Sequence, residues 1–368
     1  MFSTYAGGYS RRPLPGLPDL LGQAEQDLRE GGLDAAGYQS AADEFVREIL
    51  SEMAVVQVSI VGDGGVRWPD RVLPLIDGLD GLTAGGAAAL PDGEPATRPI
   101  VSGPVRWTRP IAVRDWEFAN AETDLWVKQT IIGPYSLAAL AEPAPGRARS
   151  RLAQELGEAL NAELRALLEA GCPMVEIDEP MASKIGNDEG EWKGLGTAHE
   201  RLTAGVNDSS EIHLSLGLWG GAIHPAGHRT LIELPYSSYL VDVLAGPPAW
   251  RFIAAVPPQR GIVVGAGDAH TETMDETEVL VWAMAWAAEG ERGSQRVGLA
   301  PNGSLCFVPR HFAHRNLLRV GEAVSIANMG PLHDVAEALD PEPLTSKMAE
   351  LRTMAEAVMA GRAAAGTA

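Results

Sequence analysis

The stretch Met174–Pro180, M-V-E-I-D-E-P, joins a short apolar strand pattern to two adjacent carboxylates and a proline. A helical pattern precedes it over residues 150–170, with leucines recurring at three- and four-residue steps. Gly171 stands where the glycine that ends a helix belongs. Helix, tight turn and strand therefore follow one another, and the strand brings Asp178 and Glu179 to its own C-terminal end.

Strand and helix patterns alternate along the rest of the chain. Helical patterns also cover residues 73–82 and 237–244, and a small-residue loop covers 83–95. The other expected strands are Val55–Val61, Ile100–Val105, Trp126–Ile132, Glu211–Leu216, Thr230–Leu234, Gly261–Gly265 and Arg296–Ala300. About eight alternating strands favour an α/β fold of the closed (β/α)8 TIM-barrel type over an open sheet. We therefore expect a single TIM-barrel domain over residues 1–368, with a polar insertion or lid near 183–210.

Composition and charge narrow the classes of partner. The formal charge is -20, from 29 Lys+Arg against 49 Asp+Glu, so nucleic acid and acidic membrane surfaces are poor partners. Cys172 and Cys306 are the only cysteines, which favours a reducing compartment. No apolar run reaches the roughly 18 residues of a membrane span. We expect a soluble cytoplasmic protein with a small-molecule substrate; a homo-oligomer is left open.

Polar side chains stand at or near the C-terminal ends of the expected strands. In a barrel these ends meet at one rim, where ligands bind, so the residues are expected to gather there. One histidine on its own would more often be a structural residue than a catalyst, but several polar strand ends together indicate a functional site. The candidates are Asp178 and Glu179, His213 and Ser215, Glu233, Asp268 and His270, and the run Pro301-Asn302-Gly303.

The order of these motifs resembles the catalytic C-terminal domain of cobalamin-independent methionine synthase. It is similar also to the short archaeal-type methionine synthases of the same superfamily, which includes uroporphyrinogen decarboxylase. The resemblance covers nearly the whole chain. Its landmarks are Gly7-Gly8-Tyr9-Ser10-Arg11, Val61–Arg67, Ile132-Gly133-Pro134-Tyr135-Ser136, Ile177-Asp178-Glu179-Pro180, His213-Leu214-Ser215, Ile232-Glu233, Gly265–His270 and Ala300-Pro301-Asn302-Gly303.

The resemblance implies transfer of a methyl group from 5-methyltetrahydrofolate to the thiol of homocysteine. In the family a zinc ion held by one His, two Cys and one Glu activates the thiol. Carried over by position, His213 stands at the zinc histidine and Glu233 at the zinc glutamate. Asp178 stands at the acid that holds the amino-acid substrate. His270 stands at the general acid, with Asp268 two residues before it to orient the imidazole.

Three departures from the family pattern concern the metal and the substrate. Ser215 stands where the first zinc cysteine is expected, and Gly303 stands where the second is expected. A hydroxyl is a poor zinc ligand and glycine supplies none, so zinc is not expected and no metal is assigned. Cys306, three residues after Gly303, could replace that ligand only after a loop shift. Gly65 replaces a glutamate that helps to fix the substrate's amino group. His213 and Glu233, the only retained family ligands, are therefore assigned with Ser215 and Asp178 to substrate binding.

The resulting hypothesis is a methyltransferase that uses a 5-methyltetrahydrofolate-like donor and an acceptor other than homocysteine, with His270 and Asp268 as its catalytic residues. A true methionine synthase with an atypical zinc site is one alternative. A non-catalytic homologue that binds a small molecule or serves as a scaffold is another, because the loss of family residues is typical of a decayed site. Decarboxylation or alkyl-thiol lyase chemistry, known elsewhere in the superfamily, is not selected by any residue.

Overall fold

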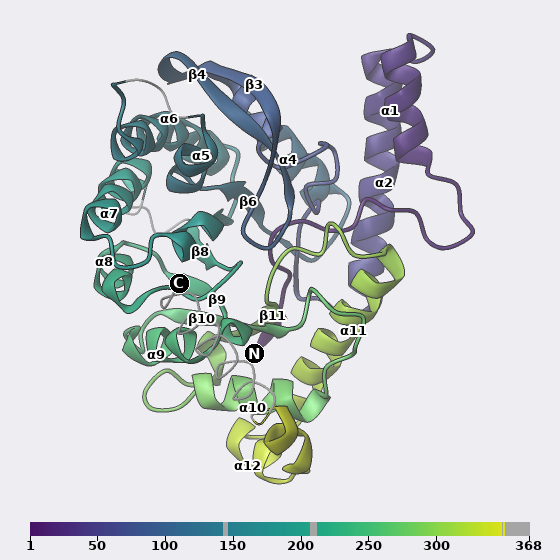
Figure 1. The fold of residues 1–368 in the computed structure, drawn as a ribbon. Coiled ribbons are helices and arrows are strands. Elements are labelled where there is room, and N and C mark those ends of the chain that lie inside the picture. The colour runs from purple at the N-terminus through teal and green to yellow at the C-terminus, as the bar shows by residue number, and fades with distance from the viewer. Residues whose placement is uncertain (143–145, 207–211, 348, 350–368) are drawn as a thin grey trace, which may run out of the picture.

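Parallel strands form the centre of the protein (Figure 1). The computed structural model describes residues 1–142, 146–206, 212–347 and 349. One sheet has seven strands in the order β1-β11-β10-β9-β8-β7-β6, and all its pairs are parallel. Its strands are β1 (Phe2–Ser3), β6 (Gln129–Ile132), β7 (Met174–Asp178), β8 (His213–Leu218), β9 (Ser238–Asp242), β10 (Gly261–Gly267) and β11 (Val297–Pro301).

Two further short strands close this sheet into a barrel. β2 (Ile60–Val61) pairs with β5 (Trp126–Val127), which continues into β6 after Lys128 alone. On its other side β2 follows β1, since the Ser59 main-chain N–H donates to the Ser3 carbonyl at 3.1 Å. Counting β5 and β6 as one strand, eight strand positions complete the ring in the described residues. The expected TIM barrel is confirmed.

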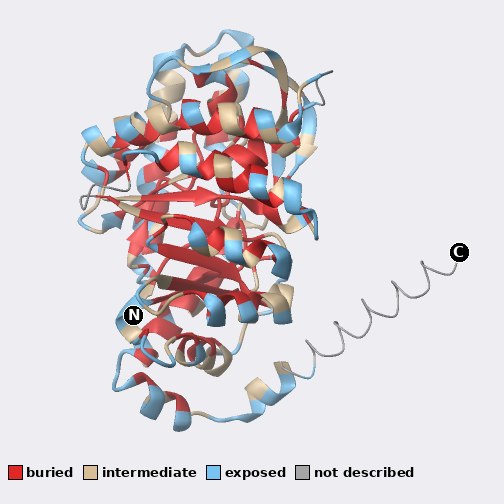
Figure 2. Cartoon of the chain, turned by 90° about the vertical axis from the view of Figure 1, so that its left-hand side faces the viewer, coloured by how far each residue is buried: buried red, intermediate tan, exposed pale blue. Residues whose placement is uncertain are grey.

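Helices surround the barrel and cover the outer faces of its strands (Figure 1). Figure 2 shows the consequence: the strands and the inward helix faces are buried, and exposure is confined to the periphery. The helices are α1 (Leu20–Glu30), α2 (Ala35–Val55), α3 (Leu73–Gly78), α4 (Val113–Ala121), α5 (Pro134–Leu140), α6 (Arg149–Glu169), α7 (Glu189–Thr203), α8 (His228–Glu233), α9 (Pro247–Ala255), α10 (Thr277–Ala287), α11 (Arg310–Ala327) and α12 (Leu332–Glu337). No helix among the described residues is both long enough and apolar enough to cross a membrane.

The helix and strand around Met174 form as the sequence predicts. α6 buries its leucine stripe, and Gly171 adopts a left-handed conformation with φ of 87°. The N–H groups of Gly171 and Cys172 close the helix end by donating to the carbonyls of Leu168 and Leu167. β7 is buried on both faces, as expected for a strand inside a helix-covered barrel.

Residues 79–107 form an antiparallel hairpin rather than a loop followed by a barrel strand. β3 (Leu79–Ala89) pairs with β4 (Pro95–Trp107), and the two lie outside the barrel ring. The expected loop at 83–95 is therefore wrong, and the strand expected at 100–105 belongs to this hairpin. The turn over residues 90–94 points back to the barrel, as its contacts with Arg71 and Ser304 show.

The expected order of strand and helix after β8 is also wrong. Residues 230–234 lie in and directly after α8, and residues 238–242 form β9 instead of a helix. Periodicity alone cannot tell whether a short apolar run of this kind forms a strand or a helix. Pairing with the neighbouring strand of the sheet decides it. Ser238 and Tyr239 pair in register with Ser215 and Leu216 of β8, so the second run is the one that completes the barrel.

Two other segments differ from expectation. The segment near 183–210 holds the short 3-10 helix η1 (Pro180–Lys184) and then α7, and its residues 207–210 lie outside the described residues. α7 buries Trp192 and Leu195 and packs against α6. The polar residues of this segment therefore belong to a helix packed on the barrel and not to a lid. The strand expected at 55–61 shrinks to Ile60–Val61, because α2 continues to Val55.

Candidate functional site

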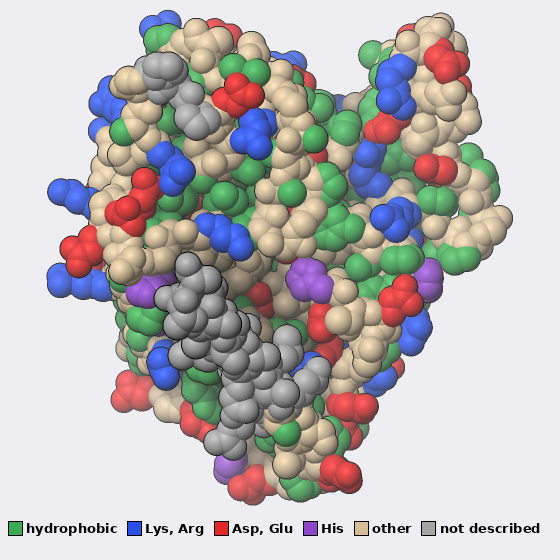
Figure 3. Space-filling view, in the orientation of Figure 1, with side chains coloured by type: hydrophobic (Ala, Val, Ile, Leu, Met, Phe, Trp, Pro, Cys, Tyr) green, Lys and Arg blue, Asp and Glu red, His purple; other side chains and the backbone are tan. Residues whose placement is uncertain are grey.

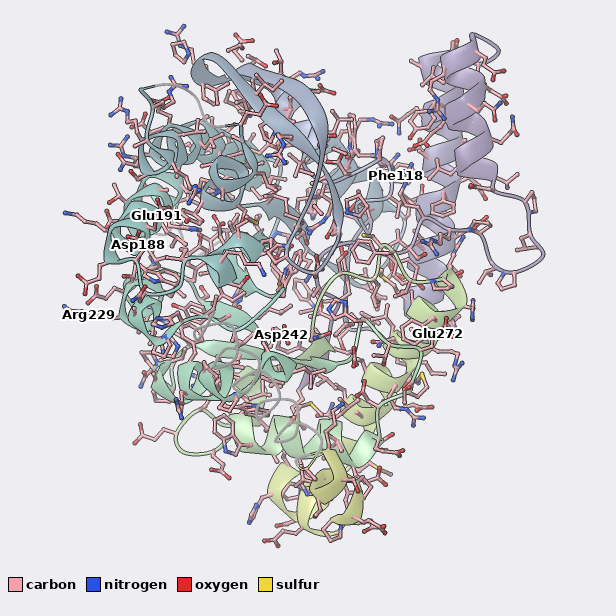
Figure 4. All side chains as sticks on the ribbon, in the orientation of Figure 1. Phe118, Asp188, Glu191, Arg229, Asp242 and Glu272 are labelled. Atoms are coloured by element: carbon pink, nitrogen blue, oxygen red, sulfur yellow. The ribbon has the colours of Figure 1, made fainter. Side chains whose placement is uncertain are left out.

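Acidic side chains gather at the C-terminal mouth of the barrel. Asp63 follows β2, Asp178 ends β7 and Asp242 ends β9, and all three are buried. Figure 4 shows Asp242 near the centre of the molecule, and in Figure 3 acidic and histidine side chains lie near the middle of the same face. Asn302, after β11, donates from Nδ2 to Asp242 Oδ1 at 3.2 Å and accepts from the Ala269 N–H at 2.9 Å. It thereby ties neighbouring strand ends together.

Arg71 holds two buried carboxylates in this mouth. Its Nε and Nη2 donate to the two oxygens of Glu94 at 2.8 and 3.0 Å, and its Nη1 donates to Asp178 Oδ2 at 2.8 Å. The guanidinium carbon lies 5.2 Å from the ring centre of Trp219. Two carboxylates against one guanidinium leave a net negative charge. The single positive charge of Arg71 therefore offsets only part of the cost of burying both carboxylates.

Asp178 is the most enclosed of these acids. It is fully buried, and burial raises its pKa to about 7 although the charge of Arg71 acts in the opposite direction. Within the part of the chain that the structure describes, Oδ1 of Asp178 and Nε1 of Trp219 make no well-directed hydrogen bond. A Cβ on Gly217 would overlap Asp178 Oδ1 and would lie 3.3 Å from Trp219 Nε1. The carboxylate therefore occupies the space that a side chain at position 217 would need.

The hairpin turn contributes two acids that come from outside the barrel. Glu94 pairs with Arg71, and Asp92 accepts from the Glu94 N–H at 3.0 Å and from the Ser304 N–H at 3.4 Å. Burial, followed by the charge of Glu94, raises the pKa of Asp92. The turn thus carries negative charge into the mouth and rests on the loop after β11.

His270 lies at the mouth, but Asp268 does not hold its ring. Asp268 Oδ1 accepts from the main-chain N–H of His270 at 2.9 Å, which shapes the loop. Within the described residues the imidazole itself makes no hydrogen bond to protein, and it is exposed. Burial raises the pKa of Asp92 and of Asp242, and His270 acts in the opposite direction on both, which is consistent with its position close to these two acids.

A small cavity of about 40 Å³ lies beside Arg71. Asp63 and Asp115 line it together with Tyr5 and Trp68. Burial and the neighbouring Asp63 raise the pKa of Asp115 to about 6, although Arg67 Nε lies 3.2 Å from its Oδ1. Trp68 Nε1 donates to the other oxygen of Asp115 at 3.2 Å. One of this carboxyl pair can therefore take up a proton near neutral pH.

His213 and Glu233 do not reach the mouth, so their expected positions are wrong. His213 begins β8, four residues or about 13 Å before the level of Asp178, and bonds to Ser238 Oγ at 2.8 Å. Glu233 lies on α8, where its exposed side chain pairs with Arg229, which Figure 4 places at the periphery. Ser215 lies inside the barrel, one layer below Asp178, and its hydroxyl makes no hydrogen bond to any described residue.

Glu179 and Glu176 serve the fold rather than the mouth of the barrel. Glu179 Oε2 accepts from the N–H and hydroxyl of Ser136 at 2.7 and 2.6 Å, and Oε1 accepts from the Tyr135 N–H at 2.9 Å. It therefore binds the first turn of α5. Glu176 pairs with Lys128 at 2.7 Å inside the barrel. Each buried carboxylate thus has the partner that burial demands.

The donor set does not fit the family's zinc ion. Gly217 and Gly303 carry no ligand atom at the strand ends of β8 and β11, and the nearest acids already bind a guanidinium. Among the described residues no three His, Cys, Asp or Glu side chains are arranged to hold a metal ion.

Sequence reasoning missed several residues of the mouth. Arg71, Asp92 and Glu94 lie outside every expected strand end and reach the site through contacts between distant parts of the chain. Asp242 was missed because β9 was expected to be a helix. The apolar run Tyr239-Leu240-Val241 before it, rich in aromatic and β-branched residues, is the signal that could have found it.

Comparison with known proteins supports this architecture. Residues 19–216 match the family model described as the catalytic domain of cobalamin-independent synthase. A methionine synthase of Sulfurisphaera tokodaii is 23% identical over 328 residues, covering 88% of this chain and 91% of that protein. A 5-methyltetrahydropteroyltriglutamate–homocysteine methyltransferase of Cronobacter sakazakii is 27% identical over 194 residues, or 51% of this chain and 26% of that protein. The match therefore spans about a quarter of that longer relative.

Two solved structures show the same fold. A B12-independent methionine synthase from Shewanella sp. W3-18-1, in complex with selenomethionine, superposes with a TM-score of 0.72 at 17% identity, covering 88% of this chain and 97% of that one. A putative B12-independent methionine synthase from Listeria monocytogenes gives 0.68 at 17% identity, covering 88% and 98%.

Proposed function

Because this chain belongs to the family of cobalamin-independent synthase catalytic domains, we propose that it is a methyltransferase with an acceptor other than zinc-activated homocysteine. The donor is a 5-methyltetrahydrofolate-like carrier, as the names of its relatives suggest. The acceptor is a small molecule whose own N–H, O–H or S–H group supplies the nucleophile. Neither a zinc ion nor another metal takes part.

The observation that carries this proposal is the position of Arg71. Its guanidinium bonds to Asp178 and Glu94, so Asp178, the acid expected to hold an amino-acid substrate, is fully buried and already paired. Of the two Asp178 oxygens only Oδ1 is left without a hydrogen-bond partner among the described residues, and it is buried, so a substrate ammonium or a metal ion could reach this carboxylate only if the side chains around it moved.

His270 is the proposed acid and base. It is an exposed titratable group at the mouth and lies close to the acids Asp92 and Asp242. Methyl transfer from a tertiary amine nitrogen needs a proton on the departing nitrogen, which an imidazolium can supply. Asp268 shapes the loop that carries His270, and Asp178 keeps Arg71 in place.

The test is a methyl-transfer assay with isotope-labelled 5-methyltetrahydrofolate and a panel of thiols, amines and hydroxyl compounds. The panel is run with a chelator and with added zinc. Transfer to an acceptor other than homocysteine, unaffected by the chelator, is the expected result. Absence of both folate binding and methyl loss from the folate would overturn the proposal.

Methionine synthase activity is the second candidate, because a relative named methionine synthase aligns over 91% of its own length. It predicts transfer to homocysteine that rises with added zinc and about one zinc per chain by elemental analysis. A preparation without zinc that transfers the methyl group elsewhere excludes it.

A further inference from the structure

Asp63 is a buried acid with one oxygen that no protein group satisfies. Only 7% of the residue is exposed, and its Oδ1 accepts from the Gly65 N–H at 3.0 Å. Among the described residues Oδ2 receives no hydrogen bond, and neither oxygen forms an ion pair. A buried carboxyl group in this situation needs a cation, a proton or a water molecule beside it.

The small cavity of about 40 Å³ beside Arg71 is the space that Asp63 lines. Thr130 of β6 lines the same cavity, and its buried hydroxyl makes no well-directed hydrogen bond to a described residue. The cavity is therefore bordered by two oxygen-bearing side chains with hydrogen-bonding capacity to spare. Its volume fits a group of one or two heavy atoms, since a water molecule needs at least roughly 10–15 Å³ of such space.

The charges around the cavity favour a cation over an anion. Each nearby buried cation is already engaged by carboxylates other than Asp63. Lys128 pairs with one acid and the two arginines pair with two acids each, so the negative charge of Asp63 is left over even when the exposed Arg114 is counted. The pairs are Lys128 with Glu176, Arg67 with Asp43 and Asp115, and Arg71 with Glu94 and Asp178.

A larger cavity of about 230 Å³ adjoins the small one. Gly65, Trp68 and Arg71 line both cavities, and at Gly65 no side chain stands between them. Trp68 is held by the hydrogen bond from its Nε1 to Asp115 at 3.2 Å, and with Phe307 it gives the larger cavity an aromatic lining. A small organic molecule therefore has room for its body in the larger cavity and for a compact cationic end in the smaller one.

We propose that Asp63 and Thr130 bind a primary ammonium group of the methyl acceptor. The ammonium group donates to Asp63 Oδ2 and to the Thr130 hydroxyl, and the body of the acceptor lies against Trp68. This inference rests on the proposed function, because the folate-like donor carries no ammonium group and the cationic ligand must then be the acceptor. The ammonium group anchors the acceptor and keeps its protons, so the methyl group goes to another atom of that molecule.

Methylammonium chloride is the probe for this site in the full-length protein. Its two heavy atoms fit the small cavity, whereas tetramethylammonium is too large, and sodium chloride at the same concentration gives the baseline. With about 100 mM methylammonium and a dissociation constant of about 10 mM, the thermal midpoint should rise by about 2 °C. Tetramethylammonium and potassium chloride should produce no such rise.

Two substitutions in the cavity test which residues bind the probe. Asp63→Asn removes the charge but keeps an oxygen for the Gly65 N–H, and the rise in midpoint should disappear. Thr130→Val keeps the shape of the side chain and should weaken methylammonium binding by about 2- to 10-fold, so it also serves if D63N does not fold. Glu233→Gln, which changes an exposed acid on α8, is the control and should keep the full rise.

Three results would overturn the ammonium site. The first is no rise in the wild type, which would mean that a proton or water satisfies Asp63. The second is an equal rise in the wild type and D63N. The third is an equal rise with tetramethylammonium or potassium, which would show a general salt effect or a site for inorganic ions.

Methyl transfer to a matched pair of thiols separates this inference from the proposed function. Cysteamine and N-acetylcysteamine carry the same thiol, but only cysteamine has an ammonium group. We expect kcat/KM to be at least about 10-fold higher for cysteamine, with the preference lost in D63N. Equal transfer to both overturns the inference and leaves the proposed function standing. Binding of methylammonium that depends on Asp63, without transfer to any acceptor, supports the ammonium site and overturns the proposed function.

Discussion

Nη1 of Arg71 donates to Oδ2 of Asp178 at 2.8 Å, across 107 residues of sequence. This one contact joins the loop after β2 to the end of β7 and places a permanent cation beside the acid to which the family resemblance assigns the amino-acid substrate. It also explains how a fully buried carboxylate is tolerated at the mouth of the barrel, since an unpaired one would be strongly unfavourable.

Replacing Arg71 should destabilise the protein strongly. Arg71→Ala leaves Asp178 and Glu94 buried without their cation, so the free energy of unfolding is expected to fall by about 3–5 kcal/mol. Urea denaturation followed by tryptophan fluorescence measures it. Arg229→Ala, which breaks the exposed pair with Glu233, is the control and should leave the midpoint unchanged. Equal midpoints for the two variants would contradict the role given to Arg71.

Gly217 should not accept a side chain. In Gly217→Ala the new methyl group overlaps Asp178 Oδ1, and because the carboxylate is held by Arg71 it cannot move without cost. Overpacking of this kind is expected to lower the free energy of unfolding by about 1–3 kcal/mol. The measurement is denaturation beside Gly86→Ala, which adds the same methyl group in open space. A G217A protein as stable as G86A would show that the space is not restricted.

The rim carboxyl of Asp242 should make stability depend on pH. Burial raises its pKa to about 6 from 3.8, so the folded protein binds more protons than the unfolded chain between these values. Its contribution therefore favours folding at low pH and weakens as pH rises from about 4 to 6, by at most about 3 kcal/mol.

Asp242→Asn removes this contribution. Denaturation of wild type and D242N at pH 4.5 and pH 7.5 gives the comparison, and we expect the stability difference between the two proteins to shift in favour of D242N at the higher pH. A constant difference across this range would contradict the raised pKa.

Substitution should show that His270, at the mouth of the barrel, contributes to methyl transfer and that Glu233, on α8, does not. His270→Ala is expected to reduce methyl transfer by about 100-fold or more, because general acid–base catalysis typically contributes that much. Glu233→Ala should leave the rate unchanged, since Glu233 is exposed on α8 and far from the mouth. The assay is the one used for the donor and acceptor panel. A large loss of activity in E233A would support the functional role that the family resemblance gave to Glu233.

The barrel could be predicted because it follows from local patterns. Apolar strands alternating with amphipathic helices have few ways to bury their faces, and a glycine placed directly after a helical pattern, such as Gly171, can close the helix in a left-handed conformation. For the same reason Asp178, Asp268 and His270 could be placed at or directly after strand ends. His213 and Glu233 were misplaced because a shift of a few residues, or a short helix read as a strand, moves a side chain from the rim to another surface.

The sequence by itself determined the barrel class of the fold and the acid at the end of Met174–Asp178. Only the tertiary structure decided what that acid meets. Arg71, Asp92 and Glu94 reach the mouth from a loop and a hairpin turn, and no local pattern encodes such distant contacts. Buried charges must find partners wherever the fold provides them, and here the partner of Asp178 is an arginine.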